Sequence, residues 1–113
     1  MVIRGSTIDE VIATGATYSS TWNIERGETP WNMPALVGNC KSDAVVTVKV
    51  QQSNDGSTVV FEETVSNIPG NATLAAGTTG AFRFARVAPY VRFSISNASG
   101  GDATASMFLY GSN

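Results

Sequence analysis

Hydrophobic and polar residues alternate most clearly in residues 44–63. Val46, Val48 and Val50 fall on one side of an extended chain, and Thr47 and other polar residues lie between them. This is the two-residue period of a half-buried β-strand. Residues 53–56 (SNDG) then supply the short polar side chains and the glycine that tight turns favour, and a second β-prone run follows. The pattern predicts a β-hairpin.

The same alternation recurs along the chain. Residues 81–87, 90–96 and 103–110 alternate with period two, and residues 16–24 are rich in β-prone side chains. Residues 25–34 carry a glycine and two prolines, which predicts a loop. Short runs of this kind, separated by turn signals, predict an all-β fold with a single antiparallel β-sandwich. The pattern leaves jelly-roll and immunoglobulin-like topologies open.

The first residues fit this scheme less well. Residues 1–14 contain apolar side chains, including Ile3 and Ile8, in neither a clean strand period nor a long helical one. We interpret this segment as an N-terminal arm with a short strand, placed to lie on a neighbouring subunit. The whole chain, 1–113, is then one domain with an arm, since 113 residues suffice for a single core.

Charge and hydropathy exclude several classes of partner. Charged residues make up only 14% of the chain, and the net charge is −2 with Lys and Arg scattered singly. No basic stripe exists to neutralise several phosphates, so nucleic acid is not an expected partner. No apolar run is long enough to span a bilayer and the start lacks a secretory signal, so we expect a soluble protein made in the cytoplasm.

Candidate catalytic and metal-binding residues are few. The chain has no histidine and a single cysteine, Cys40, so the usual general base is missing and no internal disulfide can form. We read Cys40 as a small, buried or half-buried, inert side chain. We therefore expect no enzymatic activity, no metal and no cofactor.

The acidic residues offer one alternative. Asp9 and Glu10, and likewise Glu62 and Glu63, are adjacent pairs that could hold calcium or act as a glycosidase pair. Adjacent strand residues point to opposite faces, so the pairs are read as solvated edges. Residues 54–56 resemble the opening of a calcium loop, but the remaining EF-hand spacing is absent and a hairpin turn is the favoured reading.

The aromatic residues divide into two groups. One group has strand spacing and is expected in the core: Trp22, Phe61, Phe82, Phe84 and Phe93. The other is a candidate for exposure, where aromatic side chains bind protein or sugar. It comprises Trp31, in the predicted loop, and Phe108 and Tyr110, on the polar side of the last strand.

Three segments together resemble a known class of proteins. They are VTVKVQQSNDGS (residues 46–57), PYVRF (89–93) and GGDAT (100–104). This combination is similar to small β-sandwich proteins of tailed-bacteriophage virions, among them capsid decoration (cement) proteins and tail-associated subunits. The motifs are a hairpin turn and a core strand, so the resemblance implies a fold and a setting rather than an active site.

The resemblance implies a non-enzymatic capsid decoration protein on the virion surface, synthesised in the host cytoplasm. Its expected partners are the major capsid protein or another virion protein and further copies of itself, with a trimer favoured by the resemblance. The alternatives are a carbohydrate-binding module, in which Trp31 or Tyr110 stacks on a sugar, and a tail- or fibre-associated adhesion subunit. Five residues are the candidate partner contacts: Ile3, Ile8, Trp31, Phe108 and Tyr110.

Overall fold

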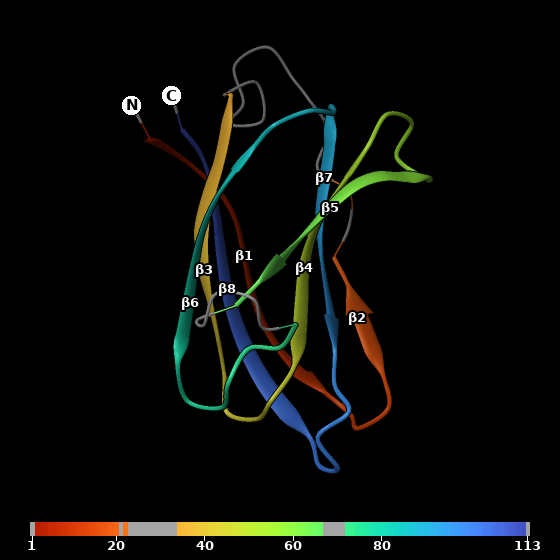
Figure 1. Ribbon diagram of the computed structural model, residues 1–113, viewed down its shortest axis with the longest axis vertical. Helices are drawn as coiled ribbons and strands as arrows, with labels where there is room; N and C mark the ends of the chain where they lie inside the picture. The colour runs from red at the N-terminus through yellow and green to blue at the C-terminus, as the bar shows by residue number, and fades with distance from the viewer. Residues whose placement is uncertain (1, 21, 23–33, 67–71, 113) are drawn as a thin grey trace.

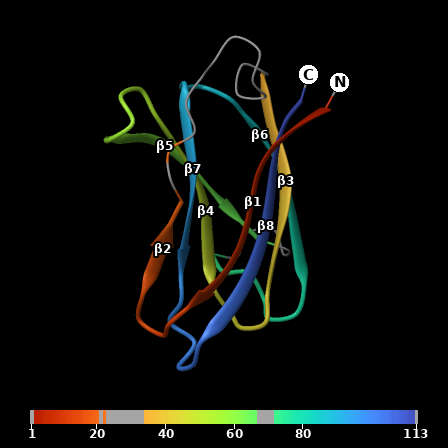
Figure 2. The same ribbon diagram turned by 180° about the vertical axis from the view of Figure 1, so that it is seen from behind.

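Strands form along most of the chain and assemble into two four-stranded sheets that face each other (Figure 1; Figure 2). The computed structural model describes residues 2–20, 22, 34–66 and 72–112, with only the backbone described for 2–9 and 110–112. This part of the chain contains no helix, and its strands pair antiparallel. The strands are β1 (Val2–Ile12), β2 (Thr17–Ser19), β3 (Ala35–Ser42), β4 (Thr47–Ser53), β5 (Val59–Val65), β6 (Thr79–Ala85), β7 (Tyr90–Ser96) and β8 (Ala103–Ser112).

The strand order is that of a jelly roll. One sheet runs β1-β8-β3-β6 and the other β2-β7-β4-β5. The first strand pairs with the last, β2 with β7, β3 with β6, and β4 with β5. The chain thus folds as one long antiparallel ribbon centred on the β4–β5 hairpin, and successive pairs alternate between the sheets. This arrangement confirms the predicted all-β sandwich and selects the jelly-roll topology.

The core lies between the inner faces of the two sheets. Val48 and Val50 of β4 and Phe93 of β7 are buried on one side, and Leu36 of β3 and Met107 of β8 on the other. The inward positions alternate with exposed or half-buried ones along β4 and β7, as the period predicted. Of the five aromatics expected in the core, Phe82 and Phe93 are buried, while Phe61 and Phe84 are half-buried.

One glycine allows β3 to lie close to its neighbours. A Cβ at Gly38 would collide with the carbonyl oxygen of Phe108 on β8 and lie 2.8 Å from the Phe82 ring. Gly38 pairs with Phe82 across β3 and β6, so the ring covers the position where a side chain is missing. Phe82 also stacks on Phe84 at 5.1 Å and meets the edge of Phe93 at 6.1 Å. Aromatic contacts therefore fill the space that the glycine leaves.

The β4–β5 turn is held by side chains that bond to its backbone. Asp55 Oδ1 accepts hydrogen bonds from the N–H groups of Ser57 and Thr58, each at 2.8 Å, and Ser53 Oγ accepts one from Gly56 N–H at 3.1 Å. The backbone N–H groups of Thr58 and Ser57, and then the Ser53 hydroxyl, lower the pKa of Asp55. Gly56 has a positive φ of 77°. The predicted hairpin is therefore confirmed, with a register shift at its end.

The N-terminal segment differs from the prediction. Instead of an arm with a short strand, residues 2–12 form β1, which pairs with β8 over nearly its whole length, with a bulge between Arg4 and Ser6. The interpretation as an arm was therefore wrong for these residues. Pairing with β8 satisfies the backbone polar groups along one edge of β1, which the irregular apolar pattern did not reveal.

The next predicted strand is also altered. The β-prone run 16–24 yields only β2, Thr17–Ser19, within the described residues. Trp22 was expected in the core but is half-buried, with the Arg92 guanidinium 4.2 Å from its ring centroid. Arg92 alternates with buried Val91 and Phe93, so this contact lies on the outer face of the sheet. Residues 25–33 of the predicted loop lie outside the described residues.

A buried amide joins β4 to the segment that follows β6. Gln52 is 1% exposed, and its Nε2 donates to the carbonyl of Ala85 at 2.9 Å. Its Oε1 accepts hydrogen bonds from the N–H groups of Val87 at 2.8 Å and Ala88 at 3.2 Å. The side chain thus supplies hydrogen-bond partners for backbone groups at the last residue of β6 and just beyond it, where the strand ladder ends.

A second buried amide, that of Asn97, joins the β1–β2 turn to the β7–β8 turn. Asn97 Nδ2 donates to the carbonyls of Ile12 and Gly101, each at 2.8 Å. Its Oδ1 accepts from the backbone N–H of Ser99 at 3.0 Å, and its backbone N–H donates to Ala16 at 3.0 Å. The β1–β2 turn and the β7–β8 turn are therefore held together by one side chain and its backbone.

We predict that Gly56→Val lowers the free energy of unfolding by about 1 kcal/mol or more, because a β-branched residue is strained at positive φ. A Cβ there would also lie 3.0 Å from the Tyr90 ring. Urea denaturation measures the effect. Gly101→Val is the matched control, since a Cβ at Gly101 meets nothing within 4 Å and its φ is not in the left-handed region. An equal decrease in the free energy of unfolding for Gly56→Val and Gly101→Val would contradict this explanation.

Gln52→Leu is expected to cost about 2–4 kcal/mol, because it leaves the backbone groups of Ala85, Val87 and Ala88 without the partner that the amide supplies. Gln51→Leu, one position away on the outer face, is expected to cost about 1 kcal/mol or less, since water can replace its bonds. Chemical denaturation of the two variants side by side tests this difference. Similar midpoints would show that the buried amide contributes little.

Candidate functional site

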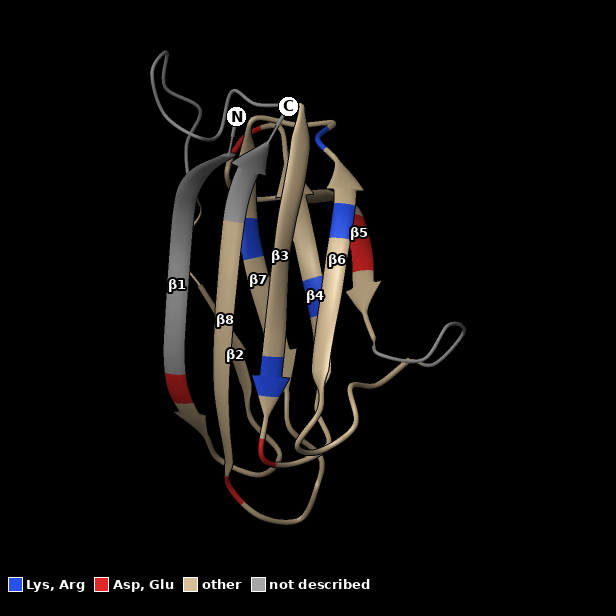
Figure 3. Ribbon diagram, turned by 90° about the vertical axis from the view of Figure 1, so that its left-hand side faces the viewer, with Lys and Arg blue, Asp and Glu red and all other residues tan. Residues whose placement is uncertain are grey.

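One of the predicted contact residues, Phe108, lies on the outer face of the sheet β1-β8-β3-β6. Figure 3 views this sheet from outside: the described charged residues lie toward the ends of β1 and β3 and on β6. No residue of β8 is charged. This face therefore offers a strip of backbone and neutral side chains along its middle.

Phe108 lies on that strip. It follows Met107 and precedes Leu109, both fully buried, and it points outward with 38% of its surface exposed. Its register partners are Asn39 on β3 and Thr7 on β1. Val11, at the end of β1, is 65% exposed. An exposed apolar side chain on an uncharged strand, such as Phe108 on β8, lowers the desolvation cost of docking another protein.

The five predicted contact residues fall into three groups. Phe108 is exposed, as its alternation with buried residues implied. Ile3, Ile8 and Tyr110 lie on β1 and β8, and the pairing of those strands brings Ile3 opposite Gly111 and Ile8 opposite Met107. The structure describes only their backbone. Trp31 lies outside the described residues.

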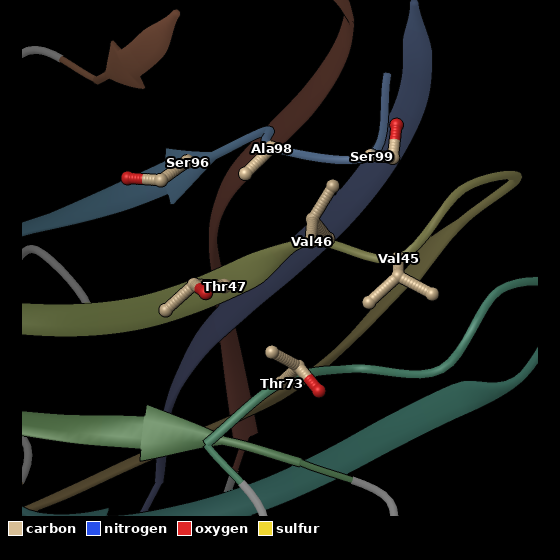
Figure 4. Close-up of a pocket in the computed structure, with 7 residues that line it drawn as sticks. All are labelled: Val45, Val46, Thr47, Thr73, Ser96, Ala98 and Ser99. Atoms are coloured by element: carbon tan, nitrogen blue, oxygen red, sulfur yellow. The ribbon is translucent and has the colours of Figure 1, made fainter. Parts of the chain in front are cut away.

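A pocket of about 330 Å³ opens at one end of the sandwich, where the start of β4 meets the β7–β8 turn (Figure 4). Its lining comprises Val45, Val46, Thr47, Thr73, Ser96, Ala98 and Ser99. None of these side chains is acidic, basic or a thiol. The Ser96 hydroxyl bonds to Thr17 Oγ1 at 3.0 Å, and the Ser99 hydroxyl bonds to Asn97 Oδ1 at 2.7 Å. The lining thus holds no group that would activate a serine.

The described residues contain no cluster of three or more histidine, cysteine, aspartate or glutamate side chains that could hold a metal ion. Glu62 points outward and bonds to Lys49 Nζ at 3.1 Å, whereas Glu63 lies on the core side of β5 and is half-buried. This pair therefore diverges, as the strand geometry required. No helix suited to crossing a membrane occurs in the part of the chain that the structure describes.

Cys40 is fully buried in the core between Asn39 and Lys41 of β3. Burial raises the pKa of its thiol from 9.0 to about 12, because the thiolate would lose its hydration. The interpretation as a small buried side chain is confirmed. The thiol serves as an apolar packing group at this position.

The outer face of the other sheet carries a connected polar network that the sequence analysis did not find. Arg92 Nε donates to Gln51 Oε1 at 2.8 Å, and Gln51 Nε2 donates to Glu62 Oε2 at 3.0 Å. Lys49 completes the chain through Glu62 Oε1. Hydrogen bonds from Gln51, and then Lys49, lower the pKa of Glu62. The two-residue period of the strands predicts that Lys49, Gln51 and Arg92 point outward. The sequence does not predict the register that pairs β4 with β5 and β7 and so brings these side chains together.

A scan against protein-family models finds no match for this chain, and a search of curated proteins also finds none.

We predict that Cys40 reacts with iodoacetamide at pH 8 at least about a hundredfold more slowly in the folded protein than in denaturant. Its raised pKa leaves a far smaller thiolate fraction, and burial excludes the reagent. Mass spectrometry over time measures the labelling. Rapid labelling without any loss of β-structure would show that the thiol is accessible, contrary to its position in the core.

Proposed function

We propose that this protein is a non-enzymatic structural component of a tailed-phage virion, most simply a capsid decoration protein that binds and stabilises the assembled capsid lattice. The observation that carries the proposal is the uncharged outer strip of the sheet β1-β8-β3-β6 with Phe108 exposed upon it. Such a role requires a rigid scaffold and a surface that can be buried, and no active site.

The surface fits docking onto a large assembly better than capture of a small molecule. A strand without charged residues runs along the middle of the sheet, and the aromatic ring is held between two buried side chains of the same strand. Aromatic groups fixed on regular structure lose little entropy on binding and are enriched at protein interfaces. The jelly roll also recurs among viral capsid proteins, although it is shared by lectins, so this likeness is an analogy of fold only.

The proposed partners are the major capsid protein or another virion protein, together with further copies of this chain. The sequence resemblance implies a trimer. A trimer could bind a repeating lattice through several weak contacts at once, and together these would give stable attachment. The protein would be made in the host cytoplasm and finish on the capsid surface. Mass determination in solution tests the oligomer, and a monomer would remove this part of the proposal.

We predict that Phe108→Lys reduces retention on tailed-phage particles assembled without the protein by about tenfold or more, because it places a charge where the proposed interface is dry. Stability should change by less than about 1 kcal/mol, since the side chain is already 38% exposed. Co-sedimentation with the particles measures retention, and thermal unfolding checks the fold.

Val87→Lys is the matched control. Val87 is 56% exposed and lies in the segment after β6, a strand that β3 separates from β8, so a lysine there should leave retention unchanged. Equal retention of Phe108→Lys and the parent protein would exclude this face as the docking surface. If the parent bound no virion particle but did bind a glycan array, the carbohydrate-binding alternative would replace the proposal.

A further inference from the structure

We infer that the outer face of the sheet β2-β7-β4-β5 holds a binding site for a carboxylate, centred on the Arg92 guanidinium and suited to an acidic side chain of a partner protein. This site is on the opposite sheet from Phe108. It is therefore independent of the proposed function.

Arg92 is held in place by two different contacts. Its Nε donates to Gln51 Oε1 at 2.8 Å, and its guanidinium carbon lies 4.2 Å from the centroid of the Trp22 ring. Gln51 is itself fixed, because its Nε2 donates to Glu62 at 3.0 Å. A guanidinium that is stacked on a ring and bonded at Nε has already lost much of its rotamer freedom, so it loses less on binding a ligand.

The contacts leave the fork of the guanidinium available. Nε is engaged, but among the described residues neither terminal nitrogen of Arg92 donates to a protein acceptor. Parallel N–H groups on a planar fork match the two oxygens of a carboxylate, and such bidentate pairs are among the stronger charge-assisted hydrogen bonds. The side chain is half-buried, so it is partly screened from water.

The charge balance of the face favours an anion with a single charge. The charged residues that point outward from the four strands of this sheet are Lys49, Glu62 and Arg92. Lys49 and Glu62 form an ion pair at 3.1 Å, and both Glu62 oxygens are engaged, one by Lys49 and one by Gln51. Among the described residues of this face, one positive charge, that of Arg92, remains without a counter-charge. A carboxylate neutralises it, whereas a phosphate dianion would leave an excess negative charge.

The arrangement of the aromatic ring favours a protein over a sugar. The guanidinium covers one face of Trp22, so that face is not available for stacking on a sugar ring. Tyr90 lies two residues from Arg92 on the same side of β7 and packs against the Gly56 position. Tryptophan, tyrosine and arginine are the residues enriched at the energetic centres of protein interfaces.

The test is a titration followed by NMR, with the Arg92 Nε–H and the Trp22 indole N–H as reporters. The probe is the peptide acetyl-Gly-Glu-Gly-amide, and its glutamine counterpart is the uncharged control. Sodium glucuronate and methyl phosphate represent an acidic sugar and a phosphate. The glutamate peptide should shift both signals in a saturable way, and the glutamine peptide should not.

Arg92→Lys keeps the charge but removes the fork, so it should weaken binding of the glutamate peptide at least about fivefold. Arg83→Lys on β6 of the opposite sheet is the matched control and should leave binding unchanged. If Arg92→Lys does not fold, Gln51→Ala provides the second variant. It removes the Nε partner and should weaken binding about threefold through lost preorganisation.

Three results would overturn the inference. The first is the absence of a saturable shift in the parent protein, and the second is equal binding of the glutamate and glutamine peptides. The third is a folded Arg92→Lys variant, or a folded Gln51→Ala variant if Arg92→Lys does not fold, that binds the glutamate peptide as tightly as the parent. Tighter binding of glucuronate or methyl phosphate than of the glutamate peptide would overturn the assignment to a protein side chain. Loss of particle retention in Phe108→Lys, with peptide binding intact, would keep the two surfaces distinct.

Discussion

The inner faces of the two sheets are buried against each other, and this burial stabilises the fold. The chain is small and has no disulfide, because Cys40 is its single cysteine. Stability must therefore come from apolar contacts between β4 and β7 on one side and β3 and β8 on the other. Side chains that point outward contribute little to this core. Residues on the outer faces can therefore vary in chemistry without loss of the fold.

The nested pairing of the strands explains why the amides Gln52 and Asn97 are buried. A ribbon that is wrapped around a core must turn at each change of sheet, and backbone groups at the turns lose their ladder partners. Gln52 bonds to the segment after β6, and Asn97 bonds to the turns after β1 and β7. Both side chains occupy inward positions where an apolar residue would leave polar backbone unsatisfied.

The two outer faces differ in chemistry because their central strands differ. On one, β8 carries no charge and displays Phe108. On the other, β4 and β7 carry Lys49, Gln51 and Arg92, which join Glu62 across the strands. The proposed capsid contact depends on the first face, and the inferred carboxylate site lies on the second.

Features that depend on local backbone geometry could be predicted from the sequence alone. The two-residue period of an extended chain identified the inward set of β4, the hairpin at residues 53–56 and the outward position of Phe108, since each follows from neighbouring residues alone. Tertiary structure decided which strands pair. It made β1 a full partner of β8, fixed the jelly-roll order, and brought Trp22 to Arg92 and Gln51 to Glu62. Such pairings join residues far apart in the chain. They are selected by the burial of whole sheet faces, which no short stretch of sequence specifies.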